Sequence, residues 1–287
     1  MDNIREITIE DKNYPAILKK IDNPPKKLYI KGEIKNNELC FAIVGTRNCS
    51  DYGKQVTLDI SRNLSKNGLT IVSGLAPGID TFAHRAVVEQ KRRTIAVLGT
   101  GIDEESIYPK ENIILARKII EFGGCIISEY PPKTKGNKFN FPNRNRIISG
   151  LSLGVLVVEA KEKSGSLITA NFALKQNKKL FAIPGPIYSI NSKGTNGLIK
   201  KGAKLVEDFR DILEELKIPI REDNIIEKGE NEEEDLILKI LEEQPSDIDK
   251  IIEKSKLPPE KAIRIIMNLE LKEKIKNLGG NIYALIR

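Results

Sequence analysis

Short apolar runs alternate with amphipathic segments through the middle of the chain. The apolar runs have the length of buried strands and cover residues 41–44, 69–72, 94–98, 125–127, 155–158 and 180–183. Most segments between them have the periodicity of helices with one apolar face. Strands that are apolar throughout are typical of a parallel sheet with helices on both faces. We therefore predict an α/β domain over residues 39–216.

The chain on either side of this domain shows different patterns. Residues 1–38 are expected to form a short N-terminal cap, with a helix over 14–21 and an edge strand at 28–30. Residues 217–235 are poor in apolar side chains and contain an acidic run, as expected for a linker. Residues 236–287 show three helical patterns and then a short hairpin, which is the element order of a winged helix.

The formal net charge of +7 is distributed unevenly. Residues 221–287 hold 12 Lys/Arg and 16 Asp/Glu, a net −4, which leaves +11 for residues 1–220. A basic surface attracts anionic partners such as nucleic acids, although surface charge alone has many causes. A site for a polyanion is therefore expected within residues 1–220.

Cysteine and histidine usage limits the chemistry. Cys40, Cys49 and Cys125 form no CxxC pair and are odd in number, which favours reduced thiols in a cytoplasmic protein. His84 is the only histidine, so a multi-histidine site is excluded and we expect no metal. The polar, acidic start and the lack of a long apolar run predict neither a signal peptide nor membrane association.

Glycine-containing loops follow the predicted strands. Residues 45–47 (GTR) end the first apolar run, and residues 73–80 (SGLAPGID) end the second. Ligands of parallel α/β sheets bind at the carboxyl ends of the strands, where these loops lie. A helix N-terminus capped by Ser50 or Asp51 and the guanidinium of Arg47 both favour a phosphate there.

Two nucleotide-binding motifs are incomplete. Gly99-Thr100-Gly101 begins like a dinucleotide fingerprint, but Glu104 stands where the third glycine is needed. The segment 45–54 is not a Walker A loop, because Asn48 occupies the first glycine position and Gln55 replaces Ser or Thr. We therefore expect neither NAD binding nor ATP hydrolysis, and we expect no cofactor.

Residues 139–146 combine two aromatic and two basic side chains in what we expect to be the end of a polar loop. Phe139 and Phe141 can stack on unpaired bases, while Arg144 and Arg146 can hold phosphates. Such stacking contributes about 1–3 kcal/mol per base. The alternative for each ring is burial in the core.

Three further groups of polar residues could have either a structural or a catalytic role. Asp80 and His84 lie four residues apart on one helix face, where an Asp that orients a packed His is favoured over a catalytic dyad. Glu159 ends a strand at the binding edge, either as a base or as a holder of backbone N–H groups. Residues 164–166 are typical of a turn and a helix cap.

Taken together, the motifs of this chain resemble those of the DNA-processing protein A family (DprA, or Smf). The resemblance covers about residues 10–215 in the family's order, and the C-terminal segment is similar to the family's winged-helix module. The segments that carry it are GTR at 45–47, SGLAPGID at 73–80 with AH at 83–84, FPNRNRIISG at 141–150, EA at 159–160, SGSLITA at 164–170, PG at 184–185, GTN at 194–196 and LI at 198–199.

The resemblance implies an extended Rossmann-type domain, with a mostly parallel sheet, that binds single-stranded DNA and dimerises. It implies that the protein is a recombination mediator that protects incoming DNA and loads RecA recombinase in natural transformation. It also implies that the protein is not an enzyme. By position, the implied DNA contacts are Gly45, Thr46, Arg47, Ser73, Gly74, Gly78, Lys110, Phe139, Phe141, Asn143, Arg144, Asn145 and Arg146. The arginines would grip phosphates, and the glycines would let backbone N–H groups approach the strand.

Two features depart from the family pattern, and one other function stays open. The N-terminal helical domain of many members is much reduced here. The net negative charge of residues 221–287, which include the winged helix, favours a protein-contact or regulatory role for this segment over DNA binding. The runner-up is a nucleotide-binding Rossmann enzyme such as a nucleoside-monophosphate phosphoribohydrolase, although Pro184-Gly185-Pro186 lacks the Pro-Gly-Gly-x-Gly-Thr signature of those enzymes.

Overall fold

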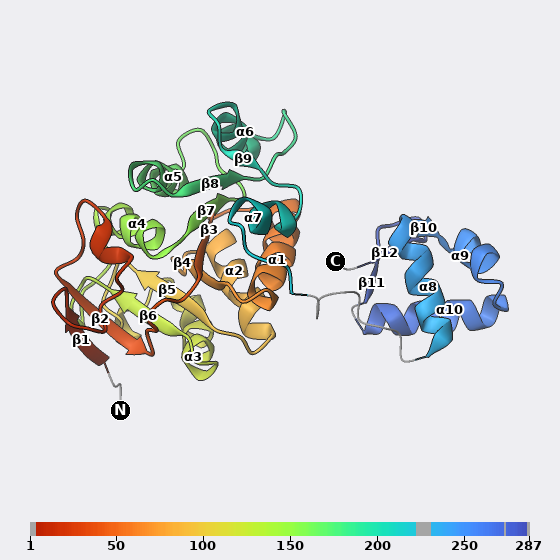
Figure 1. The fold of residues 1–287 in the computed structure, drawn as a ribbon, viewed down its shortest axis with the longest axis horizontal. Coiled ribbons are helices and arrows are strands. Elements are labelled where there is room, and N and C mark those ends of the chain that lie inside the picture. The colour runs from red at the N-terminus through yellow and green to blue at the C-terminus, as the bar shows by residue number, and fades with distance from the viewer. Residues whose placement is uncertain (1–3, 222–230, 273, 286–287) are drawn as a thin grey trace. The chain divides into compact units, whose positions relative to one another are not determined.

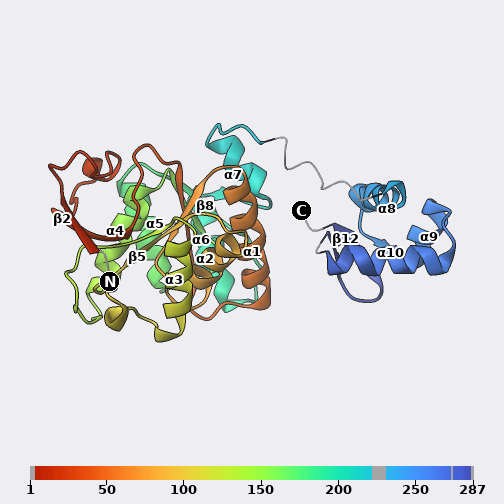
Figure 2. The ribbon, with the colours of Figure 1, turned by 90° about the horizontal axis from the view of Figure 1, so that it is seen from below.

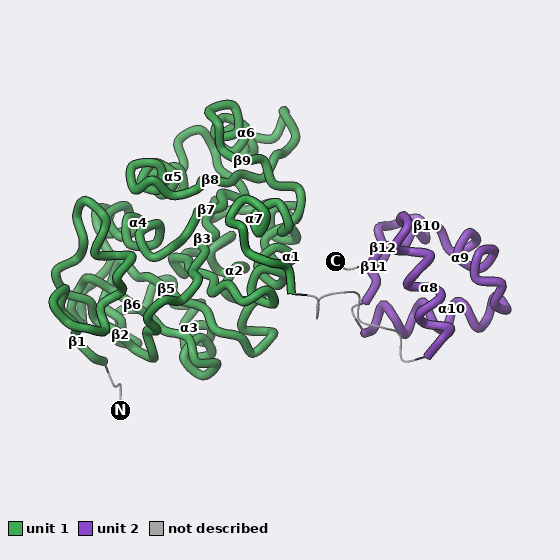
Figure 3. Tube along the Cα trace, viewed as in Figure 1, with its two compact units in different colours: residues 1–221 green, residues 222–287 purple. Residues whose placement is uncertain are grey.

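The computed structural model describes residues 4–221, 231–272 and 274–285. The chain divides into two compact units, residues 1–221 and residues 222–287 (Figure 3). Each unit has its own hydrophobic core and is described by itself.

A nine-stranded sheet forms the centre of the first unit (Figure 1). In spatial order its strands are β1 (Ile4–Thr8), β2 (Lys27–Gly32), β6 (Cys125–Ser128), β5 (Thr94–Leu98), β4 (Thr70–Ser73), β3 (Cys40–Val44), β7 (Gly154–Val157), β8 (Lys179–Ala182) and β9 (Lys204–Leu205). Every neighbouring pair from β6 to β9 is parallel, whereas β2 pairs antiparallel with β1 and β6. The prediction of a mostly parallel sheet is confirmed.

Helices cover both faces of this sheet (Figure 2). One face carries α1 (Asp51–Lys66), α2 (Ile79–Glu89), α3 (Ile113–Glu121) and α7 (Phe209–Glu215), and the other carries α4 (Asn140–Leu151), α5 (Gly165–Lys175) and α6 (Lys193–Lys200). Single 3-10 turns are η1 (Leu18–Lys20), η2 (Glu104–Ser106), η3 (Lys110–Asn112) and η4 (Ile190–Ser192). The two layers bury separate apolar clusters against the sheet.

The first strand, loop and helix follow directly from their residues. All five residues of β3 are buried, and the chain leaves the sheet at Gly45. Helix α1 begins at Asp51 because Ser50 Oγ accepts a hydrogen bond from the Gly53 N–H at 3.1 Å, as the sequence predicts. Ile60 and Leu64 then face the core. The loop between strand and helix therefore lies at the carboxyl edge of the sheet.

The N-terminal segment contributes two strands to the main sheet. β1 pairs with β2, so β2 is not the edge strand that we expected at 28–30. β1 was not predicted, because Arg5 and Glu6 are exposed and interrupt its apolar residues, as is common in edge strands. The helix expected over 14–21 is only the single turn η1.

Helix α4 begins at Asn140, whereas we expected a loop up to residue 146. The Asn137 side-chain oxygen accepts from the backbone N–H groups of Phe139 and Asn140, at 2.9 Å each, which starts the helix. Pro142 is typical of a loop in the sequence, yet it lies in the first turn, where no hydrogen-bond donor is needed. The motif at 139–146 is therefore helical from its second residue.

The second unit is a winged helix, as predicted. Its helices are α8 (Glu232–Glu243), α9 (Ile248–Ser255) and α10 (Pro259–Leu271), and its sheet has the order β10 (Ser246–Asp247), β12 (Ile282–Leu285), β11 (Ile275–Asn277). α8 begins inside the predicted linker 217–235, because Asn231 caps it. Residues 222–230 of that linker lie outside the described residues, and Ile218 packs on the first unit's core.

Two kinds of feature are absent from the described part of the chain. No helix there combines the length and the apolar character needed to cross a membrane. No group of three or more His, Cys, Asp or Glu side chains in the same ranges is placed to hold a metal ion. Cys40, Cys49 and Cys125 are free thiols.

Candidate nucleic-acid interface

Two loops meet at the carboxyl edge of the sheet and fit together through glycines. The Ile79 N–H at the start of α2 donates to the Thr46 carbonyl oxygen at 3.2 Å. A Cβ atom on Gly78 would press on that same oxygen and lie 2.6 Å from the Arg47 carbonyl oxygen, and Gly78 has a φ of +79°. A Cβ atom on Gly45 would lie 2.5 Å from Ile79 Cγ1. The close approach makes the two loops one surface and requires glycine at both positions.

Arg47 is exposed on this surface, with its guanidinium over an aromatic ring. Its Cζ lies 5.6 Å from the centroid of the Phe141 ring, within cation–π range. The Tyr108 ring, which is 50% exposed, lies 5.8 Å from the Phe141 ring with 48° between their planes. These three side chains, here called the Arg47 group, come from three distant parts of the sequence.

The two phenylalanines of the motif differ in exposure. Phe141 is half-buried, because Gly99 and Gly136 leave room for its ring: Cβ atoms there would lie 3.0 Å and 2.8 Å from ring carbons. Phe139 is 67% exposed, with Lys138 Nζ 5.2 Å from its ring centroid. Neither ring is a core residue, so both have an accessible surface for a base.

Arg144 lies inside the protein, which differs from the expectation that it grips a phosphate. It is 4% exposed, and its Nη1 donates to the carbonyl oxygens of Gly74, at 2.8 Å, and Val97. Burial lowers the pKa of Arg144 to about 10, against the opposing attraction of Asp80, so the guanidinium stays charged at neutral pH. Arg144 therefore joins α4 to the carboxyl ends of β4 and β5.

Arg146 is also turned inward, on another side of α4. Two residues apart on a helix, Arg144 and Arg146 point in different directions. Arg146 is 8% exposed, pairs with Glu129 at 2.5 Å and donates to the Asn23 carbonyl oxygen at 2.9 Å. In the described structure it joins α4 to the N-terminal segment and does not face the Arg47 group.

The remaining polar residues of the predicted site range from exposed to fully buried. Asn143 is exposed on the first turn of α4. Asn145 is half-buried and donates to the Gly165 carbonyl oxygen at 3.3 Å. Ser73 is fully buried, and its hydroxyl donates to the Ile43 carbonyl oxygen at 2.6 Å. Ser73 therefore ties two strands together beneath the loops.

Glu159 holds the Arg47 loop in place. Its carboxylate accepts from the Ser50 backbone N–H at 2.9 Å and from the Ser50 hydroxyl at 2.6 Å. Its carbonyl oxygen accepts from the Thr46 N–H at 2.8 Å, and Thr46 itself is buried. Glu159 is 3% exposed. These contacts support the loop-holding interpretation of Glu159 over its alternative as a base.

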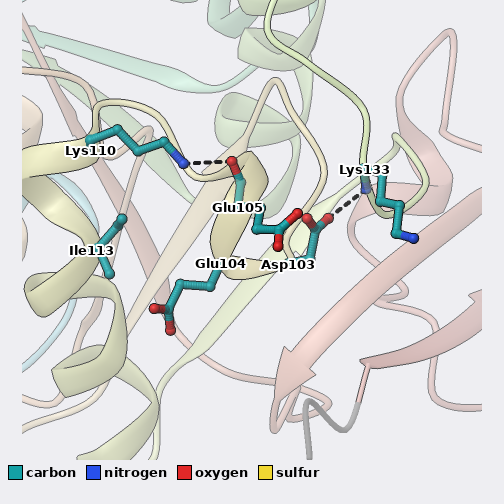
Figure 4. Close-up of a pocket in the computed structure, with 6 residues that line it drawn as sticks. All are labelled: Asp103, Glu104, Glu105, Lys110, Ile113 and Lys133. Atoms are coloured by element: carbon teal, nitrogen blue, oxygen red, sulfur yellow. Dashed lines mark hydrogen bonds between the residues drawn. The ribbon is translucent and has the colours of Figure 1, made fainter.

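Lys110 lies at a pocket of about 630 Å³ that is largely acidic (Figure 4). The lining residues are Asp103, Glu104, Glu105, Lys110, Ile113 and Lys133. Lys110 Nζ donates to the Glu105 carbonyl oxygen at 2.5 Å, and Asp103 accepts from the Lys133 backbone N–H at 2.6 Å. Because carboxylates repel a phosphate, this setting does not favour the DNA contact predicted for Lys110, which stays a prediction.

His84 is packed in the core, as the favoured interpretation has it. It is fully buried, and its Nδ1 lies 2.9 Å from Thr94 Oγ1. Asp80 instead accepts from the Gly74 N–H at 3.1 Å, so Thr94 and not Asp80 orients the ring. Burial lowers the pKa of His84 to about 3, which keeps the imidazole neutral at physiological pH.

Sequence reasoning missed Tyr108 as a member of the site. Its contact with Phe141 joins a loop to helix α4, and no local periodicity connects the two segments. The available signal was an aromatic residue in a loop after a parallel strand, at the edge where ligands bind.

Comparison with known proteins identifies the family of the chain. The model of the family described as DNA recombination-mediator protein A matches residues 5–217. The chain belongs to the DNA-processing protein A family. The family's model of the DprA winged helix domain matches residues 226–281, so both units have counterparts there.

Relatives in several bacteria are similar over most of the chain. The DNA processing protein DprA of Bacillus subtilis is 46% identical over 217 residues, which is 74% of this chain and 71% of that protein. Protein Smf of Escherichia coli is 36% identical over 291 residues, which is 98% of this chain and 77% of that protein.

Two solved structures of family members share the fold. That of DprA from Streptococcus pneumoniae has a TM-score of 0.68 and 42% identity, covering 74% of each chain. That of DNA processing protein A from Helicobacter pylori has a TM-score of 0.65 and 34% identity, covering 75% of this chain and 97% of that one. The Helicobacter pylori structure is described for its single-stranded DNA binding mode.

Proposed function

We propose that this protein is a single-stranded DNA-binding recombination mediator that performs no catalysis. The strand crosses the loops at the carboxyl edge of the sheet, with a phosphate at Arg47 and bases against Phe141, Tyr108 and Phe139. The observation that carries the proposal is the exposed guanidinium of Arg47 beside the half-buried Phe141 ring. The single-stranded DNA binding mode described for the Helicobacter pylori relative supports the same class of ligand.

The chemistry of the Arg47 group suits a single strand of any sequence. No described acidic side chain pairs with Arg47, so its charge is available to a phosphate. Every base has a face that can stack on an aromatic ring, and phosphate contacts carry no sequence information. Binding is therefore sequence-independent and weakens as salt increases.

The wider role rests on family membership. We infer that the protein forms a homodimer, protects incoming DNA and loads RecA recombinase onto it in natural transformation. The family's description as a recombination mediator supports this role. Light scattering tests the dimer. RecA filament assembly on single-stranded DNA, followed with and without the protein, tests loading, and an unchanged assembly rate contradicts it.

The first prediction concerns Arg47→Glu, which removes a phosphate contact and adds a repulsive charge. We expect affinity for labelled oligo-dT to fall by at least about tenfold, and the slope of log affinity against log salt to fall by about 0.7. Fluorescence anisotropy across a salt series measures both, with a duplex of matching length as the competing ligand. Wild type should prefer the single strand.

The matched control is Lys175→Glu, at the exposed end of α5 on the opposite edge of the sheet. It makes the same charge change and should leave oligo-dT binding nearly unaltered. Weak binding to both DNA forms, with Arg47→Glu equal to the control, would reject the proposal. The phosphoribohydrolase alternative would then be tested by assaying nucleotide hydrolysis.

A further inference from the structure

A second group of basic and aromatic side chains lies between α1 and α2. Lys54 Nζ from the first turn of α1 lies 5.3 Å from the centroid of the Phe82 ring. Arg85 Cζ, on α2, lies 5.5 Å from the same centroid. Phe82 is half-buried, and both cations are exposed. We call these three residues the Phe82 cluster.

The Phe82 cluster has two positive charges, and no acidic side chain among the described residues pairs with them. No ion pair or side-chain hydrogen bond joins Lys54 or Arg85 to another described residue. By contrast, Arg62 on α1 pairs with Glu89 on α2 at 3.0 Å. Two like charges beside one ring repel each other, so an anion that lies between them is favoured.

The cluster adjoins the loops that carry Arg47. The Phe82 N–H donates to the Gly78 carbonyl oxygen at 3.1 Å, which places Phe82 one helical turn, about 5.4 Å, along α2 from Gly78. Gly78 in turn packs on the carbonyl oxygen of Arg47. Lys54 lies one turn into α1 from Ser50, at the end of the same loop. A chain of phosphates that leaves Arg47 on this side therefore meets Lys54 and Arg85.

We propose that the Phe82 cluster is a second nucleotide-binding position for single-stranded DNA, beyond the Arg47 group. Lys54 and Arg85 hold phosphates of the strand as it leaves Arg47, and the Phe82 ring stacks on one base. The inference rests on the proposed function and extends the path of the strand from the sheet edge onto the helices α1 and α2. It also predicts that long strands bind by more contacts than short ones.

The test compares oligo-dT of about 3 nucleotides, which the Arg47 group alone can hold, with oligo-dT of about 20 nucleotides, which also reaches the Phe82 cluster. The double variant Lys54→Gln with Arg85→Gln should leave the short oligonucleotide unaffected. For the long one, the slope of log affinity against log salt should fall by about 1.4, or 0.7 for each lost phosphate contact. Phe82→Leu keeps an apolar side chain and should weaken only the long oligonucleotide, by roughly tenfold.

The matched control is Lys66→Gln, at the last residue of α1, with Lys91→Gln, in the turn just after α2, which together remove the same charge. Circular dichroism melting should be alike for both double variants. Equal affinity of Lys54→Gln/Arg85→Gln and the control for the long oligonucleotide overturns the inference, and so does an equal loss for both lengths. Arg47→Glu should weaken both lengths. If it weakens neither, the proposed function of the Arg47 group fails, and that result is distinct from a failure of the Phe82 cluster alone.

Discussion

Arg47 and Arg144 have opposite roles, although both belong to the motifs shared with the family. Arg47 is exposed above Phe141, with no acidic partner in the described structure. Arg144 is buried, where a charge needs hydrogen-bond acceptors and a counter-charge, and Gly74, Val97 and Asp80 provide them. One arginine is therefore available to a ligand, and the other fixes the helix that carries Phe141.

His84 leads to a prediction about stability and pH. The Thr94 hydroxyl donates to the Ile71 carbonyl oxygen at 2.6 Å, so it can only accept from His84 Nδ1, and the ring is the neutral Nδ1–H tautomer. Its pKa of about 3 in the folded protein lies below the value of about 6.5 in the unfolded chain. The unfolded chain therefore binds a proton first as pH falls. The resulting stability is fully present above about pH 6.5 and is lost progressively toward pH 3.

Urea unfolding between pH 4 and 8 measures this effect in wild type and His84→Gln. The His84 contribution to the slope reaches about 1.4 kcal/mol per pH unit below pH 6.5, and the variant should lack it. Carboxylates titrate in both proteins, so the difference between the two curves isolates His84, the only histidine of the chain. Parallel curves over the whole range would show that His84 is not held neutral.

At this scale the sequence predicts which residue types belong to the site but not which way they point. Arg47 lies in the loop that follows an apolar strand, so its exposure could be predicted. Arg144 and Arg146 looked equivalent, because their burial depends on α4 starting at Asn140 and on partners far along the chain. Tyr108 could not be placed for the same reason, since only the tertiary fold brings it to Phe141.

At the scale of elements, the site depends on the contact between the loop after β3 and the start of α2. Gly78→Ala tests that contact, because a Cβ atom there would press on the carbonyl oxygens of Thr46 and Arg47. Gly78 has φ +79° and ψ −129°, a backbone conformation that costs an alanine about 1–3 kcal/mol, and the collision adds to this cost. We expect lower stability and, because the Arg47 loop must shift, roughly tenfold weaker binding of oligo-dT, the equivalent of one misplaced charge-assisted contact.

Gly202→Ala separates the two effects. Gly202 also has a positive φ, +97°, but no atom lies within 4 Å of the position of its Cβ. This variant should lose about 1–2 kcal/mol of unfolding free energy and bind oligo-dT like wild type. If Gly78→Ala behaves the same way, the contact between the two loops does not position Arg47.

Elements marked by a long apolar run or a capping residue could be predicted, and those defined by pairing could not. The parallel strands and the Ser50 cap of α1 follow from local residues. β1 has no apolar run and is held only by pairing with β2. The start of helix α4 depends on hydrogen bonds to the side chain of Asn137, whereas the sequence around Pro142 is typical of a loop.

At the scale of the whole molecule, the two units differ in charge and in exposed side chains. Residues 1–220 carry the net positive charge, and residues 221–287, which include the acidic run before and at the start of α8, carry a net −4. In helix-turn-helix DNA binders the second helix of the motif, here α10, enters the major groove. Its exposed positions Ile263, Met267 and Leu271 recur every four residues and give it an apolar stripe. This surface suits a protein partner better than a phosphate backbone.

We therefore expect deletion of residues 222–287 to leave oligo-dT affinity within about twofold of the full chain, with an unchanged dependence on salt. The first unit has its own cores and should keep its melting behaviour after the deletion. Arg47→Glu in the shortened chain should have the same effect as in the full chain, which verifies that the site is intact. A large loss of affinity, with a reduced salt slope, would instead mean that the winged helix contributes phosphate contacts. The strand would then extend beyond the first unit despite the acidic charge of the second.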